Sequence, residues 1–245
     1  MASDEDDNPF PASVPRDQRI WRYLTFGKFV SLLVTKALWF SRVDRFEDPF
    51  EGKVTKETIR RYGPISTMGN IKDMENARQW IYANCWYIAD EESAAMWRLY
   101  SASSEAIAIQ SSYERLHVEL PPNCHICEVR YIDYDRDLID IINLLAPFVH
   151  KRKSFAHERE LRALIHDWET PSIPTDRPDT FAHDYEMKNE TMGQLVPVNI
   201  HRLIDRIYIA PQAPTWFRDV VAHTAENHGF TRGQVIASAL DEIPY

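Results

Sequence analysis

The sequence predicts a single α+β domain with a mixed or mostly antiparallel sheet and flanking helices. Three observations support this fold class. Apolar and aromatic segments of strand length follow one another without the regular strand–helix alternation of a parallel α/β protein. Hydrophobic residues make up 44% of the 245 residues, which is enough to form a full core. The chain shows no internal repeat or low-complexity block that would indicate a repeat protein or a disordered one.

Each element is predicted from its local pattern. Aromatic and β-branched segments indicate strands, and apolar residues recurring at positions i, i+3 and i+4 indicate helices. In chain order we expect a strand at 20–24, a helix at 26–36, a strand at 38–41, a loop at 44–52, mainly helical chain at 56–82 with a break at 63–64, a strand at 84–88, a helix at 91–101, strands at 106–109 and 128–132, a helix at 137–155 interrupted at 147, a strand beginning at 158, a polar surface loop at 167–190, strands at 194–200 and 206–210, a helix at 215–228 and a closing segment at 235–240.

Several boundaries carry residues suited to them. Thr25 and Asp90 can cap the helices that follow them. Pro197 lacks a backbone donor and therefore demotes its strand to the edge of the sheet. His228–Gly229 is a sound helix end. Residues 1–18 are rich in Asp, Pro and Ser and predict a flexible arm, so the domain is expected to comprise residues 19–245.

Composition excludes some functions. Thirty-seven acidic and 28 basic residues give a formal net charge of -9, which argues against a duplex-DNA binder. No run of 18 apolar residues occurs and the N-terminus is acidic, so we expect a cytoplasmic protein without a membrane partner. Three cysteines fit a reducing compartment. Cys124 and Cys127 have the spacing of half a zinc site, but no second pair follows, and no metal is expected.

The segment from Glu158 to Arg162 is the most distinctive charged feature. If it is extended, Glu158, Glu160 and Arg162 share one face at steps of roughly 7 Å, because side chains alternate along a strand. If it is helical, the three side chains disperse. The preceding basic residues 151–153 could bind phosphate or could be a solvated helix end.

Five segments resemble a bacterial family of unknown function, number 2971 in the domain-of-unknown-function series. They are Trp21–Tyr23, Leu38–Ser41, Phe46–Gly52, Met96–Tyr100 and Lys153–Arg162. The resemblance spans about residues 19–240. It implies membership of this family but no reaction.

Three residues in order also resemble the ADP-ribosyltransferases, which carry an Arg or His on an early strand, a Ser or Tyr on a second and a Glu-x-Glu on a later one. Here these are Arg22, Ser41 and Glu158-x-Glu160. The resemblance implies an ADP-ribosyltransferase-like fold and NAD as the substrate, with Arg22 on the phosphates and Ser41 supporting the nicotinamide ribose. It implies that Glu160 stabilises an oxocarbenium-like transition state, with Glu158 as helper. Ser41 is followed by Arg42-Val43, a departure from the Thr-Ser of the clearest transferases.

We also expect a nucleotide ligand and a role in bacterial stress or phage defence, either for such an enzyme or for a non-catalytic module; the sequence does not identify a macromolecular acceptor. The remaining candidates for contact with the nucleotide are Tyr23, Trp97, Tyr100, Lys153, Arg162, Asp48 and Glu51. The aromatic residues among them could stack on a flat ring or could belong to the core.

Three alternatives remain open. Arg22, Glu158, Glu160 and Arg162 could form a buried ion network that only fixes strand register. A metal-dependent nuclease or phosphohydrolase could use Asp44 or Asp48 with Glu158 and Glu160 as magnesium ligands and Lys153 as the cation facing the phosphate. A non-catalytic module could bind a nucleotide or partner protein through Trp86, Trp97 and Arg162.

Overall fold

The computed structural model describes residues 13–63, 65–66, 69–100, 104–141, 143–167, 172–174 and 181–241. It confirms the predicted α+β class with a mixed sheet. The strands of the main sheet are β1 (Arg19–Thr25), β2 (Ala37–Arg42), β5 (Ile81–Ile88), β6 (Ala106–Ser112), β7 (Cys124–Glu128), β10 (Glu160–His166), β13 (Gly193–Pro197), β14 (Arg206–Ile209) and β15 (Val235–Ala237). Only β14 and β15 pair in parallel among the strand pairs described for this sheet.

The other elements cover this sheet or extend from it. The helices are α1 (Phe26–Thr35), α2 (Lys56–Tyr62), α3 (Ile71–Ala77), α4 (Ala94–Tyr100), α5 (Tyr113–Glu119), α6 (Ile200–Leu203) and α7 (Thr215–Asn227), and the 3-10 helices are η2 (Val43–Arg45), η3 (Arg78–Trp80), η4 (Ala146–Val149), η5 (Lys153–Glu158), η6 (Arg232–Gln234) and η7 (Ala239–Asp241). Short strand pairs are β3 (Ile65–Ser66) with β4 (Gly69–Asn70), β8 (Arg130–Ile132) with β9 (His150–Arg152), and β11 (Ser172–Pro174) with β12 (Phe181–His183).

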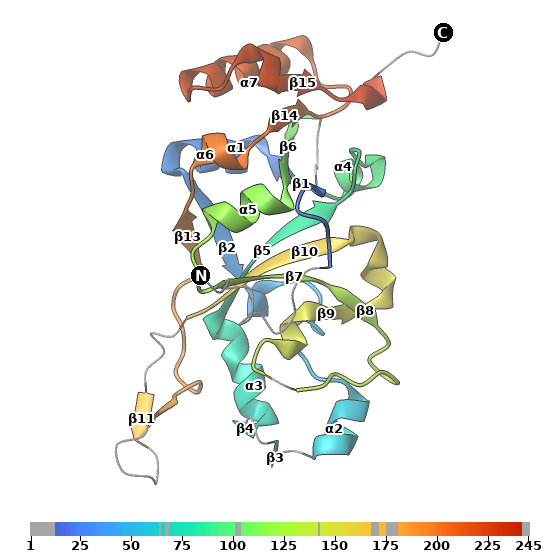
Figure 1. The fold of residues 1–245 in the computed structure, drawn as a ribbon, viewed down its shortest axis with the longest axis vertical. Coiled ribbons are helices and arrows are strands. Elements are labelled where there is room, and N and C mark those ends of the chain that lie inside the picture. The colour runs from blue at the N-terminus through green and yellow to red at the C-terminus, as the bar shows by residue number, and fades with distance from the viewer. Residues whose placement is uncertain are drawn as a thin grey trace.

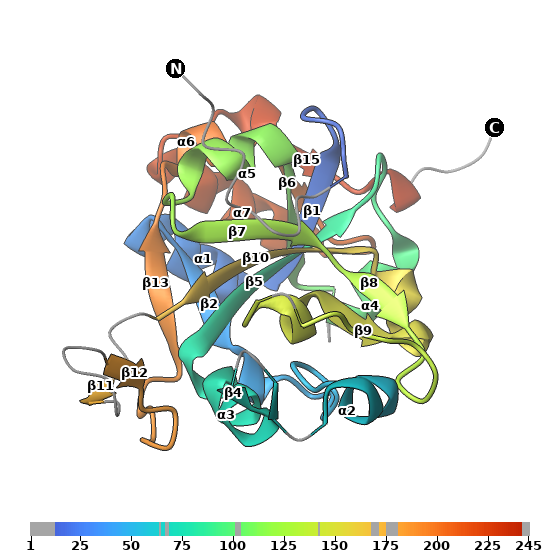
Figure 2. The same ribbon diagram turned by 60° about the horizontal axis from the view of Figure 1, so that its bottom comes forward.

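The sheet branches at β5. One edge of β5 pairs with β10 from Ile81 to Tyr87, and β10 in turn pairs with β7. The other edge is shared by β2 and β1, from which the sheet continues to β13 on one side and to β6, β14 and β15 on the other. Figures 1 and 2 show α1, α5, α6 and α7 gathered around the β1–β6–β14 part, whereas α2 and α3 lie at the opposite end of the molecule.

The core follows the same division. The largest buried cluster joins α1, α5 and α7 to the sheet and includes Phe29, Leu33 and Phe217. A second cluster packs η4 against β5 and β10 around Phe148, and a third packs α4 against β1 around Trp21 and Trp97. The apolar strands of the main sheet therefore form the surface against which these helices pack.

Several predicted boundaries are confirmed. The Thr25 hydroxyl accepts a hydrogen bond from the Lys28 backbone N–H at 3.4 Å and so caps α1. Gly229 adopts a φ of +86° just after α7, as expected for a helix end. Pro197 ends β13, which lies at the edge of the sheet.

Other predictions were wrong. No α-helix covers the described part of 137–155, which contains η4, β9 and the start of η5. Pro147 lies in the first turn of the 3-10 helix η4, and residues 150–152 pair in parallel with β8. The strand predicted at 128–132 is divided between β7 and β8, which belong to different sheets. The helix predicted from residue 91 begins at Ala94, where Ser93 rather than Asp90 supplies the capping oxygen. The polar segment 167–190 includes the hairpin β11–β12.

The division into an arm of residues 1–18 and a domain of residues 19–245 stays a prediction, since residues 1–12 lie outside the described part. Within the described residues, no helix combines the length and the apolar character needed to cross a bilayer.

Candidate active site

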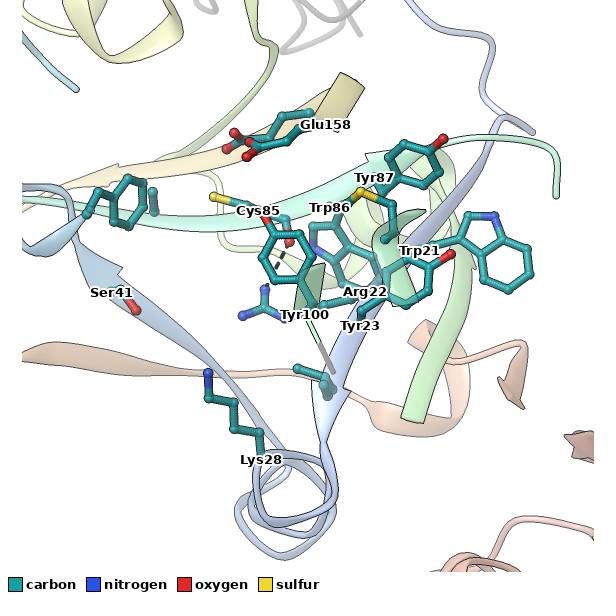
Figure 3. Close-up of a pocket in the computed structure, with 15 residues that line it drawn as sticks. Trp21, Arg22, Tyr23, Lys28, Ser41, Cys85, Trp86, Tyr87, Tyr100 and Glu158 are labelled. Carbon is teal, nitrogen blue, oxygen red and sulfur yellow. Dashed lines mark hydrogen bonds between the residues drawn. The ribbon is translucent and has the colours of Figure 1, made fainter. Parts of the chain in front are cut away.

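A wedge opens in the sheet where β1 and β2 leave β5. β1 pairs with β5 at Trp21↔Tyr87, and β2 pairs with it at Ser41↔Ala83. The two strands meet β5 at points four residues apart, and α1 joins the end of β1 to the start of β2. Between the two pairing points, none of the described strands pairs with residues 84–86 of β5 on this edge. Figure 3 shows this triangle, with Arg22 and Tyr23 on β1, Ser41 on β2, Lys28 on α1 and Glu158 beyond β5.

A partly open pocket fills the wedge. Its volume is about 170 Å³, comparable with the roughly 150 Å³ cavity that holds one benzene ring. Its lining comprises Trp21, Arg22, Tyr23, Leu24, Lys28, Ser41, Phe46, Ala83, Cys85, Trp86, Tyr87, Met96, Tyr100, Glu158 and Glu160. The enclosed space therefore suits one aromatic ring, and the rest of a larger ligand would extend through the open side.

Arg22 stands in this wedge without a carboxylate partner. Its guanidinium donates to the backbone oxygen of Cys85 at 3.5 Å and lies 6.0 Å from the Trp86 ring. No acidic side chain of the described residues lies within ion-pair distance of it. Burial lowers the pKa of Arg22 to about 10, because desolvation disfavours a charge that no carboxylate among the described residues compensates. An anionic ligand would restore that compensation.

Lys28 adds a second positive charge. It projects from the first turn of α1, lines the same pocket, and forms no ion pair with any of the described residues. One side of the pocket is therefore cationic.

The opposite wall is carboxylate-rich and already internally paired. Glu160 is only 5% exposed, and Arg162 holds it in a bidentate pair, with Nε to Oε1 at 2.7 Å and Nη2 to Oε2 at 3.0 Å. Arg162 also holds Glu51 through bonds of 2.9 and 3.3 Å and donates to the Phe148 backbone oxygen. All five guanidinium donors of this fully buried arginine are satisfied.

Lys151 completes the cluster. Its ammonium group contacts Glu158, lies 3.3 Å from Glu51 and lies 3.4 Å from Glu160. We call Glu51, Lys151, Glu158, Glu160 and Arg162 the carboxylate wall. Burial alone would raise the pKa of Glu160, but Arg162 and then Lys151 outweigh it and lower the pKa to about 2. Glu160 is therefore ionised at neutral pH.

Two unusual backbone positions bring the wall together. Gly52 has a φ of +71°, and a Cβ there would lie 2.6 Å from Cε1 of Phe148, so glycine lets the 48–52 turn set Glu51 against Arg162. Arg159 adopts a left-handed conformation with a φ of 37° at the end of η5. The sequence predicted a strand that begins at Glu158, but β10 begins at Glu160 and Glu158 lies in η5. Both carboxylates nevertheless line the same pocket.

The aromatic candidates divide. Tyr23 and Tyr100 line the pocket, and the Tyr23 hydroxyl accepts a hydrogen bond from the Ser93 backbone N–H at 2.8 Å. Trp97 is not among the lining residues. It is 2% exposed, meets Tyr23 edge-on at 4.9 Å, and donates from Nε1 to Glu92. Trp97 thus belongs to the core.

Six of the eleven predicted site residues meet at the pocket: Arg22, Tyr23, Ser41, Tyr100, Glu158 and Glu160. Arg162 holds Glu160 and Glu51 pairs with Arg162, and neither Arg162 nor Glu51 is among the residues that line the pocket. Asp48 pairs with Arg152 at 2.8 Å, and the exposed Lys153 pairs with Asp137 at 3.3 Å. Residues 151 and 152 belong to β9 and Lys153 begins η5, so this basic segment is not the C-terminal end of a helix, and phosphate contact by Lys153 stays a prediction.

Sequence reasoning missed Lys28 and Cys85 as lining residues and Lys151 as the cation that joins the three carboxylates. Lys28 had a usable signal, since it opens the helix that follows the Arg22 strand. The predicted ion network exists around Glu158, Glu160 and Arg162, but Arg22 does not join it.

The metal-site alternative finds no assembled ligand set. Asp44 is held by Arg42 and Asp48 by Arg152, and neither lines the pocket. In the described ranges, no group of three or more His, Cys, Asp or Glu side chains is arranged to hold a metal ion. Cys85, Cys124 and Cys127 form no disulfide with one another.

No family model matches the chain, and no curated protein matches it by sequence. Two solved structures resemble it distantly, both of DarT from Thermus sp. 2.9. The complex with ADP-ribosylated ssDNA has 11% identity and a TM-score of 0.42 over 95% of this chain and 99% of that one. The complex with carba-NAD+ has 13% identity and a TM-score of 0.39 over 93% and 98%. This likeness is too distant to assign a reaction, and membership of family 2971 stays a prediction.

Proposed function

We propose that this protein is an ADP-ribosyltransferase-like enzyme that cleaves NAD and transfers ADP-ribose to an acceptor. The observation that carries the proposal is that Arg22, Ser41 and Glu160 line one pocket of ring size. They come from β1, β2 and β10, up to 138 positions apart in the chain. Their separation across the sheet would have ended this hypothesis.

The charges of the pocket match those of NAD. Arg22 and Lys28 suit the diphosphate, because a guanidinium and an ammonium both donate to phosphate oxygens. The enclosed volume of about 170 Å³ suits the nicotinamide ring. The ionised carboxylate wall suits the ribose, on which positive charge develops in the transition state.

The reaction is a substitution at the ribose anomeric carbon. The bond from C1′ to the nicotinamide nitrogen breaks, and its electron pair leaves with the ring, which becomes neutral nicotinamide. The resulting oxocarbenium-like centre takes an electron pair from an acceptor oxygen or nitrogen, which loses a proton. Glu160 would stabilise this centre, Glu158 would assist nearer the mouth, and Ser41 would support the ribose.

A second candidate is a non-catalytic module that binds the dinucleotide without turnover. It is favoured by the state of Glu160, whose two oxygens already accept bonds from Arg162 and Lys151. Because these cations already neutralise the charge of Glu160, the carboxylate would stabilise a positively charged reacting centre less strongly. Glu158 has only Lys151 as its partner among the described residues.

The test combines binding and turnover on the same variants. NAD should raise the melting temperature without added metal, and wild type should release nicotinamide, measured by chromatography. Glu160→Gln should keep the thermal shift and lose the release. Glu57→Gln, which removes a half-buried carboxylate of α2 that pairs with Arg60 and lies outside the pocket lining, is the matched control and should change neither.

Each outcome separates the candidates. Unchanged nicotinamide release by Glu160→Gln contradicts the transferase proposal. A thermal shift without release by wild type over hours supports the binding module instead. No thermal shift with NAD contradicts both. A role in bacterial stress or phage defence belongs to the same proposal, and expression of wild type but not Glu160→Gln should lower phage plating efficiency.

A further inference from the structure

The carboxylate wall carries more negative than positive charge. Among the charged side chains that the structure describes, Glu51, Glu158 and Glu160 pair with Lys151 and Arg162 alone, so one negative charge is left over. The neighbouring Asp48–Arg152 pair is neutral as a unit. Cys85 adds no charge, because burial raises the pKa of its thiol well above its ordinary value.

Two members of the carboxylate wall, Glu158 and Glu160, line the pocket, so the excess negative charge faces it. Burial raises the pKa of Tyr100, and the charges of Glu158 and Glu160 raise it further. The hydroxyl of Tyr131 accepts a hydrogen bond from the Glu160 backbone N–H at 2.8 Å. Burial raises the pKa of Tyr131, and the charges of Glu160 and Glu158 raise it as well. Lys151 opposes these effects at both tyrosines without cancelling them. Arg22 forms no ion pair with the wall, so its charge stays on the other side of the pocket.

We infer that the carboxylate wall selects a positively charged planar ring, and that Glu51 sets this selectivity although it does not line the pocket. Resting on the proposed function, the inference means that the site prefers oxidised NAD, whose pyridinium ring is cationic, to NADH, whose ring is neutral. The two dinucleotides share the same diphosphate, so Arg22 and Lys28 bind both alike.

Glu51 is the position at which the excess charge can be removed. The side chain of Glu51 is 1% exposed. Its two ion-pair partners, Arg162 and Lys151, are not among the residues that line the pocket. In Glu51→Gln, two carboxylates face two cations, and the amide oxygen can still accept from Arg162. The variant is therefore expected to fold, with a neutral wall.

The experiment compares two ligands on three proteins. Carba-NAD and its reduced form, in which the ribose–nicotinamide bond resists cleavage, are titrated calorimetrically into wild type, Glu51→Gln and Glu51→Asp. One unit charge acting over several ångströms at the dielectric typical of protein sites changes affinity on the order of tenfold. Wild type and Glu51→Asp should prefer the oxidised form by about that factor, and Glu51→Gln should bind the two forms within about twofold.

The control is Glu119→Gln, which removes a buried carboxylate at the end of α5, paired with Arg202 and outside the pocket lining. It should keep the wild-type preference. A Glu51→Gln protein that also keeps it overturns the role of Glu51. Equal binding of both forms by wild type overturns the charge selectivity but leaves the proposed function intact.

A second measurement needs no variant and no dinucleotide. N1-methylnicotinamide is a cationic ring, whereas nicotinamide is neutral and nearly the same size. Wild type should bind the cation more tightly by about the same factor, on the order of tenfold. Equal binding of these two rings overturns the inference even if Glu51→Gln fails to fold. Failure of both dinucleotides to bind, with the ring preference present, contradicts the proposed function alone.

Discussion

Arg162→Met should be among the most destabilising single substitutions in this protein. The variant fills a similar volume but removes the cation that donates to Glu160, Glu51 and the Phe148 backbone oxygen. Lys151 would then face three carboxylates alone in a site where Glu51 and Arg162 are almost completely buried. Breaking a buried ion pair from one side typically costs about 3–5 kcal/mol. Domains of this size lose roughly 2–4 °C of melting temperature per kcal/mol, so a loss of about 10 °C is expected.

The assay is urea denaturation of Arg162→Met and wild type at neutral pH without nucleotide. Lys153→Met is the control, because Lys153 is 63% exposed and holds only a surface pair with Asp137, which is worth at most about 1 kcal/mol. The penalty of Arg162→Met should shrink as the pH falls below 5, since protonation neutralises the stranded carboxylates. A destabilisation below about 1 kcal/mol, or one independent of pH, would refute the view that Arg162 balances these charges.

Three further predictions follow from individual residues. The folded pKa of Glu160 is about 2 against an ordinary 4.5, so ionised Glu160 contributes about 3 kcal/mol to the free energy of unfolding. This contribution is complete above pH 4.5 and is lost as the pH falls toward 2. Denaturation at a series of pH values should show the loss in wild type and not in Glu160→Gln. Gly52→Ala should cost about 2–4 kcal/mol in the same assay through its positive φ and the clash with Phe148, whereas Gly27→Ala in α1, with open space around it, should cost nothing; equal costs would contradict this. Arg22→Met should lower NAD affinity in calorimetry about tenfold or more while leaving the melting temperature unchanged or higher, since it removes an uncompensated charge; unchanged affinity would count against the phosphate role.

The strands that frame the pocket could be predicted from the sequence because each is a local pattern. Residues 20–24, 38–41 and 84–88 are aromatic or apolar runs that become buried strands, and Thr25 caps the helix between the first two. The order of Arg22, Ser41 and Glu160 along the chain was also visible in the sequence, through its resemblance to the ADP-ribosyltransferases. Their convergence was not, because it depends on β1 and β2 sharing one edge of β5, a long-range pairing that no local pattern encodes.

The failures have the same origin. Residues 137–155 have helix-compatible apolar spacing, yet residues 150–152 gain backbone bonds by pairing with β8, and Pro147 favours a tight turn. Glu51 and Arg162 lie 111 positions apart, so the sequence offered no reason to place one against the other. Asp48, Glu51, Lys153 and Arg162 were predicted as ligand contacts from their types alone; the structure pairs each of them with another side chain and none lines the pocket, so ligand contact by these four stays a prediction.

The separation of charge across the pocket is the strongest argument that this cluster is more than a support for the sheet. A purely structural network would be most stable if Arg22 neutralised the excess negative charge of the wall. Instead, Arg22 lies in the wedge with a backbone oxygen and the Trp86 ring as its partners, while the wall retains one unmatched carboxylate. Both features cost stability, and natural chains retain such costs mainly where a ligand offsets them. A ligand with an anionic diphosphate and a cationic ring offsets both at once.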